Sequence, residues 1–176
     1  MFAKPIVAVA IIAVVTFVAR PAAAQLSLGS PDGPPRVELG VGAFDLNPSN
    51  RKNSGTQGDF RGEYHFGDVL VPLFSPFLGA DITTTGGSYV YGGFGFDINF
   101  SPNFVLTPNG AVGWYQRGNG TPLSSWFEFR TGAEFDYKFD DQSRLGIAVH
   151  HISNAGLTKI NPGEQSALLV YQIPLR

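Results

Sequence analysis

The sequence predicts an all-β protein, an eight-stranded antiparallel transmembrane β-barrel, and three observations lead to this fold class. Apolar residues recur at every second position over much of the chain, the period of a strand with two unlike faces. Several alternating runs exceed the five or six residues usual in soluble strands and match the roughly 9 to 11 that cross a bilayer at a tilt. No run after Gln25 approaches the roughly 18 apolar residues of a transmembrane helix. Only a soluble β fold or a membrane barrel then remains.

The first 24 residues are predicted to be a cleavable secretory signal peptide. Lys4 supplies the positive start, and residues 6–19 form an apolar run of 14 residues, the length of a signal-peptide core and short for a membrane span. Three alanines at 22–24 offer a small-residue cleavage site. The mature protein would then be residues 25–176, a single outer-membrane barrel domain.

The composition argues against several kinds of function. Without residues 1–24, ten Lys and Arg stand against 14 Asp and Glu, a net charge of −4. Nucleic-acid binding needs clustered basic residues, and no such cluster occurs. There is no Cys, so disulfides, thiolate zinc sites and a Cys nucleophile are unavailable. An eight-stranded barrel is just wide enough to be filled by side chains, so a diffusive pore is not expected.

Eight segments carry the two-faced pattern. In chain order they are residues 37–46, 60–66, 73–83, 88–99, 104–116, 127–139, 144–153 and 166–175. In 127–139 the odd positions are Phe, Phe, Thr, Ala, Phe, Tyr and Phe, whereas the even ones are Glu, Arg, Gly, Glu, Asp and Lys. A soluble β-sandwich would also alternate. The signal peptide, even strand number, long strands and many aromatic residues together favour the membrane barrel, whose apolar face meets lipid.

The polar face of these strands is expected to point inward, where its charges should pair, because isolated buried charges are costly. The charged side chains concerned are Arg61, Glu63, His65, Glu128, Arg130, Glu134 and Lys138.

Connection lengths predict which way each strand runs. Short connections are expected near 67–72, 101–103 and 140–142, and longer ones at 47–59, 118–123 and 154–165 on the opposite end, with a short turn at 84–87 as an exception. Outer-membrane barrels have short periplasmic turns and longer external loops. The strand 144–153 should therefore run outward and end at the cell surface.

A candidate catalytic pair lies at the end of this strand. Period two puts His151 and Ser153 on the lipid-facing side, in line with the apolar odd positions from Leu145 onward, and puts His150 inside. Polar groups on a lipid-facing surface need partners or a role. A neutral His beside a Ser hydroxyl is the minimum base and nucleophile pair for acyl transfer. The alternative is that both residues merely end a strand in the headgroup zone.

The loop that follows offers the remaining parts of such a site. Glu164 could fold back, accept the other ring N–H of His151 and stabilise the imidazolium as it forms. A tetrahedral intermediate also needs donors for its oxyanion, and Asn154, Gly156 and Asn161 lie in the right segment.

The C-terminal part of the sequence resembles a known family. Residues 151–156 (HISNAG), 161–164 (NPGE) and 171–175 (YQIPL) are similar to the C-terminal signature of the PagL-type lipid A 3-O-deacylases, over about residues 148–175. The upstream strands resemble that family only in pattern and length. The resemblance implies an eight-stranded outer-membrane barrel that hydrolyses the ester-linked acyl chain at position 3 of lipid A, with no cofactor and no metal.

Carried over residue by residue, the family's nucleophile falls on Ser153, its base on His151 and its acidic triad member on Glu164, while Asn161 matches an Asn associated with the oxyanion hole. The loop between Ser and Glu varies by a residue among relatives, and Gln165 could orient a ring but not neutralise an imidazolium. The final Arg176 departs from the aromatic residue that ends many outer-membrane barrels.

We therefore expect a serine esterase whose partner is lipid A, or lipopolysaccharide, in the outer leaflet, and no nucleic acid. A non-catalytic structural or adhesion barrel is the alternative, and acyl transfer to another lipid would use the same residues. The residues leave open whether the barrel forms a homodimer.

Overall fold

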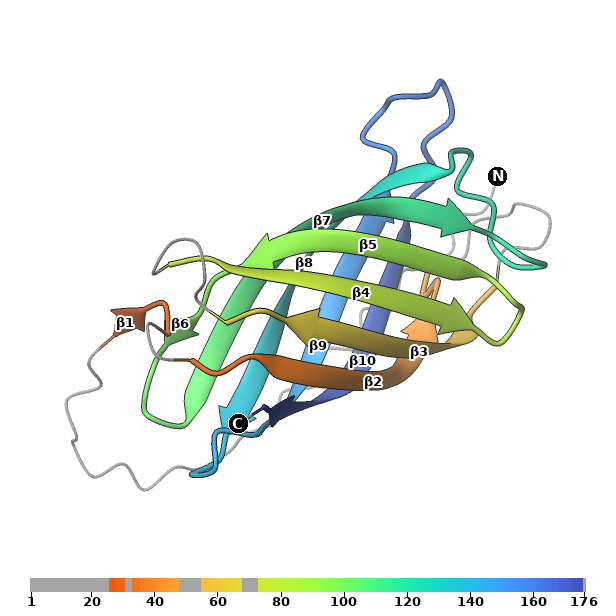
Figure 1. Ribbon diagram of the computed structural model, residues 1–176. Helices are drawn as coiled ribbons and strands as arrows, with labels where there is room; N and C mark the ends of the chain where they lie inside the picture. Colours follow the sequence, from red (N-terminus) through yellow and green to blue (C-terminus); the bar gives the residue numbers. More distant parts are fainter. Residues whose placement is uncertain (1–25, 31–32, 48–54, 68–72, 176) are drawn as a thin grey trace, which may run out of the picture.

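The computed structural model describes residues 26–30, 33–47, 55–67 and 73–175, in which the chain forms one antiparallel sheet that closes on itself (Figure 1). The wall consists of β2 Arg36–Phe44, β3 Gln57–His65, β4 Ser75–Thr83, β5 Ser88–Gly95, β7 Phe104–Gln116, β8 Phe127–Lys138, β9 Arg144–Ser153 and β10 Glu164–Pro174. Each wall strand pairs with the next along the chain, and β10 pairs with β2 to complete the ring. The predicted eight-stranded antiparallel barrel is confirmed.

Two short strands, β1 Ser27–Leu28 and β6 Ile98–Asn99, add to one end of the wall. They account for one difference from the predicted elements, because the run 88–99 is divided into β5 and β6. The predicted signal segment, 1–24, lies outside the described residues. None of the described residues forms a helix long and apolar enough to cross a membrane.

A second difference concerns β10, which begins at Glu164, two residues earlier than the sequence pattern predicts. Side chains alternate along β10. The face that carries Ser166 and Leu168 is buried inside the barrel, and the face that carries Leu169 and Tyr171 points outward. The early start gives Glu164 an inward side chain and leaves Gln165 on the outer surface. This parity decides the geometry of the candidate site.

The outer surface is apolar and the interior is mostly polar, as the strand pattern predicts. Large apolar side chains from every wall strand are more than a third exposed, for example Leu39 on β2, Val112 on β7 and Ile147 on β9. The interior holds ion pairs: Arg130 Nη1 donates to Glu63 Oε1 over 2.7 Å, and Arg61 Nε donates to Asp81 Oδ1 over 2.8 Å. The expected pairing is confirmed for these groups, whereas both carboxylate oxygens of Glu128 are buried without a hydrogen-bond partner among the described residues.

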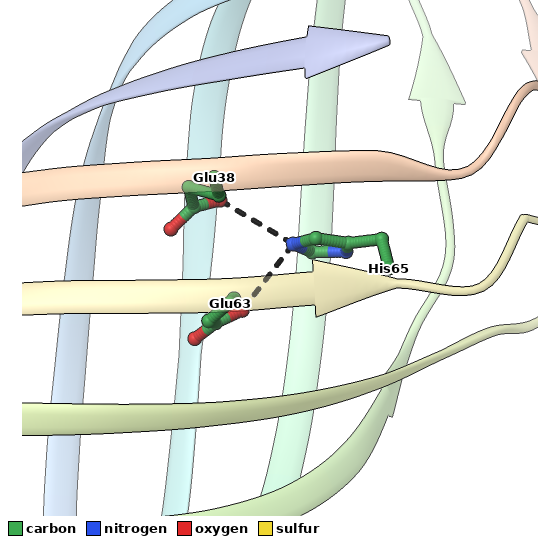
Figure 2. Close-up of side chains that lie close together, drawn as sticks. All are labelled: Glu38, Glu63 and His65. Carbon is green, nitrogen blue, oxygen red and sulfur yellow. Dashed lines mark ion pairs between the residues drawn. The ribbon is translucent and has the colours of Figure 1, made fainter. Parts of the chain in front are cut away.

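Figure 2 shows another part of this interior, where His65 Nε2 lies 3.4 Å from Glu38 Oε2 and 3.3 Å from Glu63 Oε2. These three side chains lie close enough together to hold a metal ion. Both carboxylates already accept hydrogen bonds from neighbours, Glu63 from Tyr91 and Arg130 and Glu38 from Gln172. We interpret the group as a structural ion-pair cluster, in line with the expected structural role of His65.

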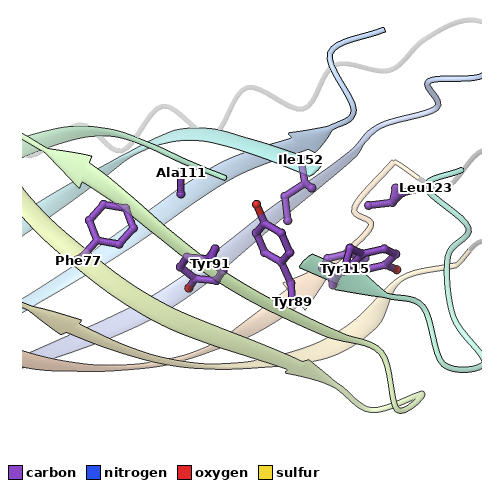
Figure 3. Packing of buried hydrophobic residues seen from close by; sticks show 8 residues of the cluster. Phe77, Tyr89, Tyr91, Ala111, Tyr115, Leu123 and Ile152 are labelled. Carbon is purple, nitrogen blue, oxygen red and sulfur yellow. The ribbon is translucent and has the colours of Figure 1, made fainter. Parts of the chain in front are cut away.

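One end of the barrel, where β9 ends and β10 begins, is filled by an aromatic cluster; we call it the loop end. The loop between β9 and β10 stands out from this end in Figure 1. Figure 3 shows the side chains that fill the interior below it: Phe44, Phe77, Tyr89, Tyr91, Ala111, Tyr115, Leu123 and Ile152. The buried tyrosines direct their hydroxyls to partners, Tyr89 to the carbonyl of Glu128 and Tyr115 to that of Thr121. A filled interior leaves the outer surface of this end as the place for a site.

Candidate active site

The last residues of β9 direct the side chains of His151 and Ser153 to the outside of the barrel. Exposure alternates along β9, so that His150 and Ile152 are buried, His151 is exposed and Ser153 is half-buried. Ile152 is part of the aromatic cluster and is fully buried between the two outward residues, which fixes the direction of both (Figure 3). His150 accepts a hydrogen bond at Nδ1 from Arg61 Nη1 over 3.1 Å, in the polar interior where it is expected.

The ring of His151 is held by the start of β10. His151 is the register partner of Gln165, and its Nδ1 lies 2.9 Å from the main-chain oxygen of Glu164 and 3.3 Å from Gln165 Nε2. A carbonyl oxygen can only accept, so Nδ1 must carry the proton that it donates to Glu164. In the neutral ring, Nε2 is then the nitrogen that can take up a proton.

The carboxylate of Glu164 does not meet His151. It points into the barrel, where the residue is 1% exposed and Oε2 accepts a hydrogen bond from Asp45 N over 3.1 Å. The structure thus brings Glu164 to His151 through its main-chain carbonyl, not through the side chain expected from the sequence. The cause is strand parity: as the first residue of β10, Glu164 cannot turn outward like a loop residue.

Gly163 allows the His151 ring to lie against the chain at this point. It has φ +63°, and a Cβ there would come within 2.7 Å of His151 Cε1. Glycine alone satisfies both the left-handed backbone and the close approach.

The three predicted oxyanion donors differ in what they are free to do. Asn154 is fully buried, and its Nδ2 donates to Thr158 Oγ1 over 2.9 Å and to the carbonyl of Ile160 over 3.0 Å. Gly156 N donates to Asn154 Oδ1. Both groups therefore hold the loop together.

Asn161 is exposed, and its Oδ1 accepts a hydrogen bond from Asn154 N over 3.0 Å. Since that contact requires the amide oxygen, the NH₂ group of Asn161 is directed away from Asn154. Of the three, Asn161 is the residue with a side-chain donor that can serve an oxyanion.

An open groove of about 680 Å³ lies over β4, β5, β7 and β8, and its nearest lining residues belong to β8, the strand beside the candidate pair. Gly92 and Gly110 contribute no side chains to it, and Phe129 and Thr131 line the side nearest β9. Thr131 is the register partner of His151, and Phe129 that of Ser153. The remaining lining residues include Leu78, Phe94 and Val112. The groove is thus a largely apolar depression whose lining includes the β8 register partners of both candidate residues.

The sequence matches a known protein family. The family described as "Lipid A 3-O-deacylase (PagL)" matches residues 73–174, which is more than half of the chain and includes both His151 and Ser153. The chain belongs to the PagL family of lipid A 3-O-deacylases. The resemblance noted in the sequence is thereby confirmed.

Solved structures agree with this family at the level of the fold. The crystal structure of the outer membrane enzyme PagL is similar with a TM-score of 0.63 and 20% identity, covering 80% of this chain and 99% of that one. A de novo designed transmembrane β-barrel is similar with a TM-score of 0.55 and 15% identity, covering 84% and 100% of the two chains. No curated protein matches the sequence.

Proposed function

We propose that this member of the PagL family is a serine esterase that hydrolyses the 3-O-acyl ester of lipid A in the outer membrane, with Ser153 as nucleophile and His151 as general base. The observation that carries the proposal is the outward direction of both side chains at the end of a lipid-facing strand. A base held through Nδ1 has its Nε2 available for a serine proton.

In the acylation step, Ser153 Oγ attacks the carbonyl carbon of the ester and His151 Nε2 takes the hydroxyl proton. The Asn161 NH₂ group is suited to stabilise the resulting oxyanion. Collapse of the intermediate breaks the bond to the sugar oxygen, which leaves with the proton from His151. The acyl chain is now an ester of Ser153.

In the deacylation step, water attacks the acyl-enzyme while His151 takes its proton. Ser153 then leaves with that proton, and the acyl chain is released as a free fatty acid. Atoms and charges balance without a cofactor or a metal ion.

The substrate would approach sideways from the membrane. The groove that ends on β8, next to the strand of the candidate pair, has the apolar lining and the size expected for a ligand of this kind. The long connections at the loop end favour an orientation in which it faces the cell exterior, where it would meet lipid A of the outer leaflet. In this proposal residues 1–24 are the signal peptide that directs export.

Isotope-labelled water separates hydrolysis from the alternatives. The refolded barrel would be incubated with purified lipid A in detergent containing H₂¹⁸O, and the lipid and released acids analysed by mass spectrometry. We expect lipid A that lacks one hydroxyacyl chain, and a free hydroxy fatty acid with one ¹⁸O. An unlabelled acyl chain on a second lipid would indicate a transferase, and intact lipid A with folded protein would support a structural barrel.

A further inference from the structure

The side chain opposite His151 on the outer surface is not a carboxylate. Gln165 is its register partner on β10, and Gln165 Nε2 lies 3.3 Å from His151 Nδ1. The neighbouring acid, Glu164, has its carboxylate inside the barrel. The element that normally orients a catalytic His in a Ser-His-acid triad is therefore missing on this face.

We infer that Gln165 is the side chain that positions His151 for catalysis, together with the main-chain carbonyl of Glu164. The inference rests on the proposed function of Ser153 and His151 and goes beyond it by assigning the third member of the group. Gln165 is a positioning residue, because it acts on the ester only through His151.

The protonation of the ring determines how the amide of Gln165 is used. With Nδ1 protonated toward the Glu164 carbonyl, a second donor at 3.3 Å would be repulsive. Half a turn of the amide exchanges its oxygen and nitrogen, and the oxygen then shares the Nδ1 proton. Gln165 and the carbonyl together fix the tautomer in which Nε2 is the base.

The outward neighbours of His151 are uncharged, so the Gln165 amide and the Glu164 carbonyl are the groups that orient its ring. The outward positions nearest to it on the two paired strands are Phe129, Thr131, Ala133, Gln165 and Ala167, none of them charged. The loop contributes one charged residue, Lys159, which is exposed. On the inner face, Glu164 is the acid nearest in sequence, and it is directed away. The imidazolium formed during turnover is therefore stabilised by dipoles and not by a carboxylate.

The experiment compares Gln165→Met and Gln165→Glu with the wild type over a pH series, with Gln116→Met as the matched control. Gln116 is an exposed Gln at the same end of the barrel, on β7, and should leave turnover unchanged. We expect Gln165→Met to lower kcat about tenfold with little change in KM, the loss typical of one hydrogen bond. Gln165→Glu should raise kcat and move the acid limb of the profile up by about one pH unit, because a carboxylate favours the imidazolium.

Glu164→Gln tests the competing assignment. It should lower kcat less than Gln165→Met does. If it lowers kcat as much, or if Gln165→Met keeps the wild-type kcat and pH profile, the inference is wrong.

A readout that does not need turnover separates this inference from the proposed function. In the folded barrel with ¹⁵N-labelled His, the His151 signal, assigned through His151→Asn, should show the Nδ1-protonated tautomer in the wild type and a tautomer mixture in Gln165→Met. The same tautomer population in both proteins would overturn the inference, whether or not lipid A is hydrolysed. Loss of lipid A hydrolysis in the wild type would instead count against the proposed function.

Discussion

Gly163 lies against the edge of the His151 ring, so closely that a Cβ at residue 163 would come within 2.7 Å of His151 Cε1. Gly156, in the same loop, also has a positive φ, +80°, but a Cβ there would meet nothing within 4 Å. The two glycines thus share a backbone requirement and differ in contact with the candidate base.

Gly163→Ala and Gly156→Ala form a matched pair on this basis. Each should lose about 1 kcal/mol of loop stability, because an L side chain disfavours the left-handed region. Only Gly163→Ala should displace the His151 ring. A misplacement of about 1 Å in a catalytic group can lower kcat about 10²-fold. Steady-state turnover of lipid A by the two refolded variants checks this. Equal kcat values would show that the contact has no catalytic consequence.

The adjacent histidines should have opposite roles. His151→Asn should lower kcat by about 10² to 10⁴, the range of a general base. His150→Asn should keep most of kcat. It should lower the free energy of unfolding by about 1–3 kcal/mol, because Arg61 loses its buried acceptor. Turnover and urea unfolding of both variants measure the two effects. A large loss of kcat in His150→Asn, with kcat retained in His151→Asn, would reverse the assignment.

Asn161 should contribute its NH₂ group to the oxyanion. Asn161→Asp keeps the oxygen that accepts from Asn154 N but removes the NH₂ donor, so kcat should fall by about 10² to 10³ while the loop stays folded. Asn119→Asp, at an exposed asparagine in another loop at this end, serves as the control. Wild-type kcat in Asn161→Asp would exclude this residue from the oxyanion site.

The interior ion pairs should govern stability and not turnover. Arg130 donates to Glu63 over 2.7 Å and lies over the ring of Tyr91, 4.1 Å from its centroid. Arg130→Met leaves the Glu63 charge with less compensation and should cost about 3–5 kcal/mol in urea unfolding. Arg117→Met, at an exposed position, should stay within about 0.5 kcal/mol of the wild type. A similar small change in both would mean that the interior pairing is not needed for stability.

The barrel could be predicted from the sequence because period-two alternation persists along each strand. The run 127–139 is nearly the same as β8, and its even positions Glu128, Arg130 and Glu134 are buried as the pattern requires. The direction of His151 and Ser153 followed from the same rule. Parity is a strong signal here because a slip by one residue would exchange every inward and outward side chain.

The role of Glu164 could not be predicted in the same way, because it depends on where β10 begins. Treated as a loop residue, Glu164 could turn outward; as the first strand residue it shares the inward face of Ser166. Strand ends are the least certain part of a sequence pattern. Extending the alternation of 166–175 back by two residues would have put Gln165, and not Glu164, beside His151.

The different roles of Asn154 and Asn161 could not be predicted from the sequence. Both are asparagines in one loop, and their residue type and spacing are equally suited to donate to an oxyanion. Only the hydrogen bonds show that the NH₂ group of Asn154 is used within the loop, whereas Asn161 is exposed and engages the loop through its amide oxygen. Such roles depend on tertiary contacts that have no period along the chain.

The role of Ser153 as nucleophile is tested by comparing the refolded wild type with Ser153→Ala on purified lipid A by mass spectrometry. Ser153 is half-buried at a strand end, so the variant should fold normally. We expect the wild type to remove one hydroxyacyl chain and the variant to lose at least about 10³-fold of this activity, because the nucleophile is gone. Equal deacylation by the two folded proteins would contradict the assignment of Ser153 as the nucleophile.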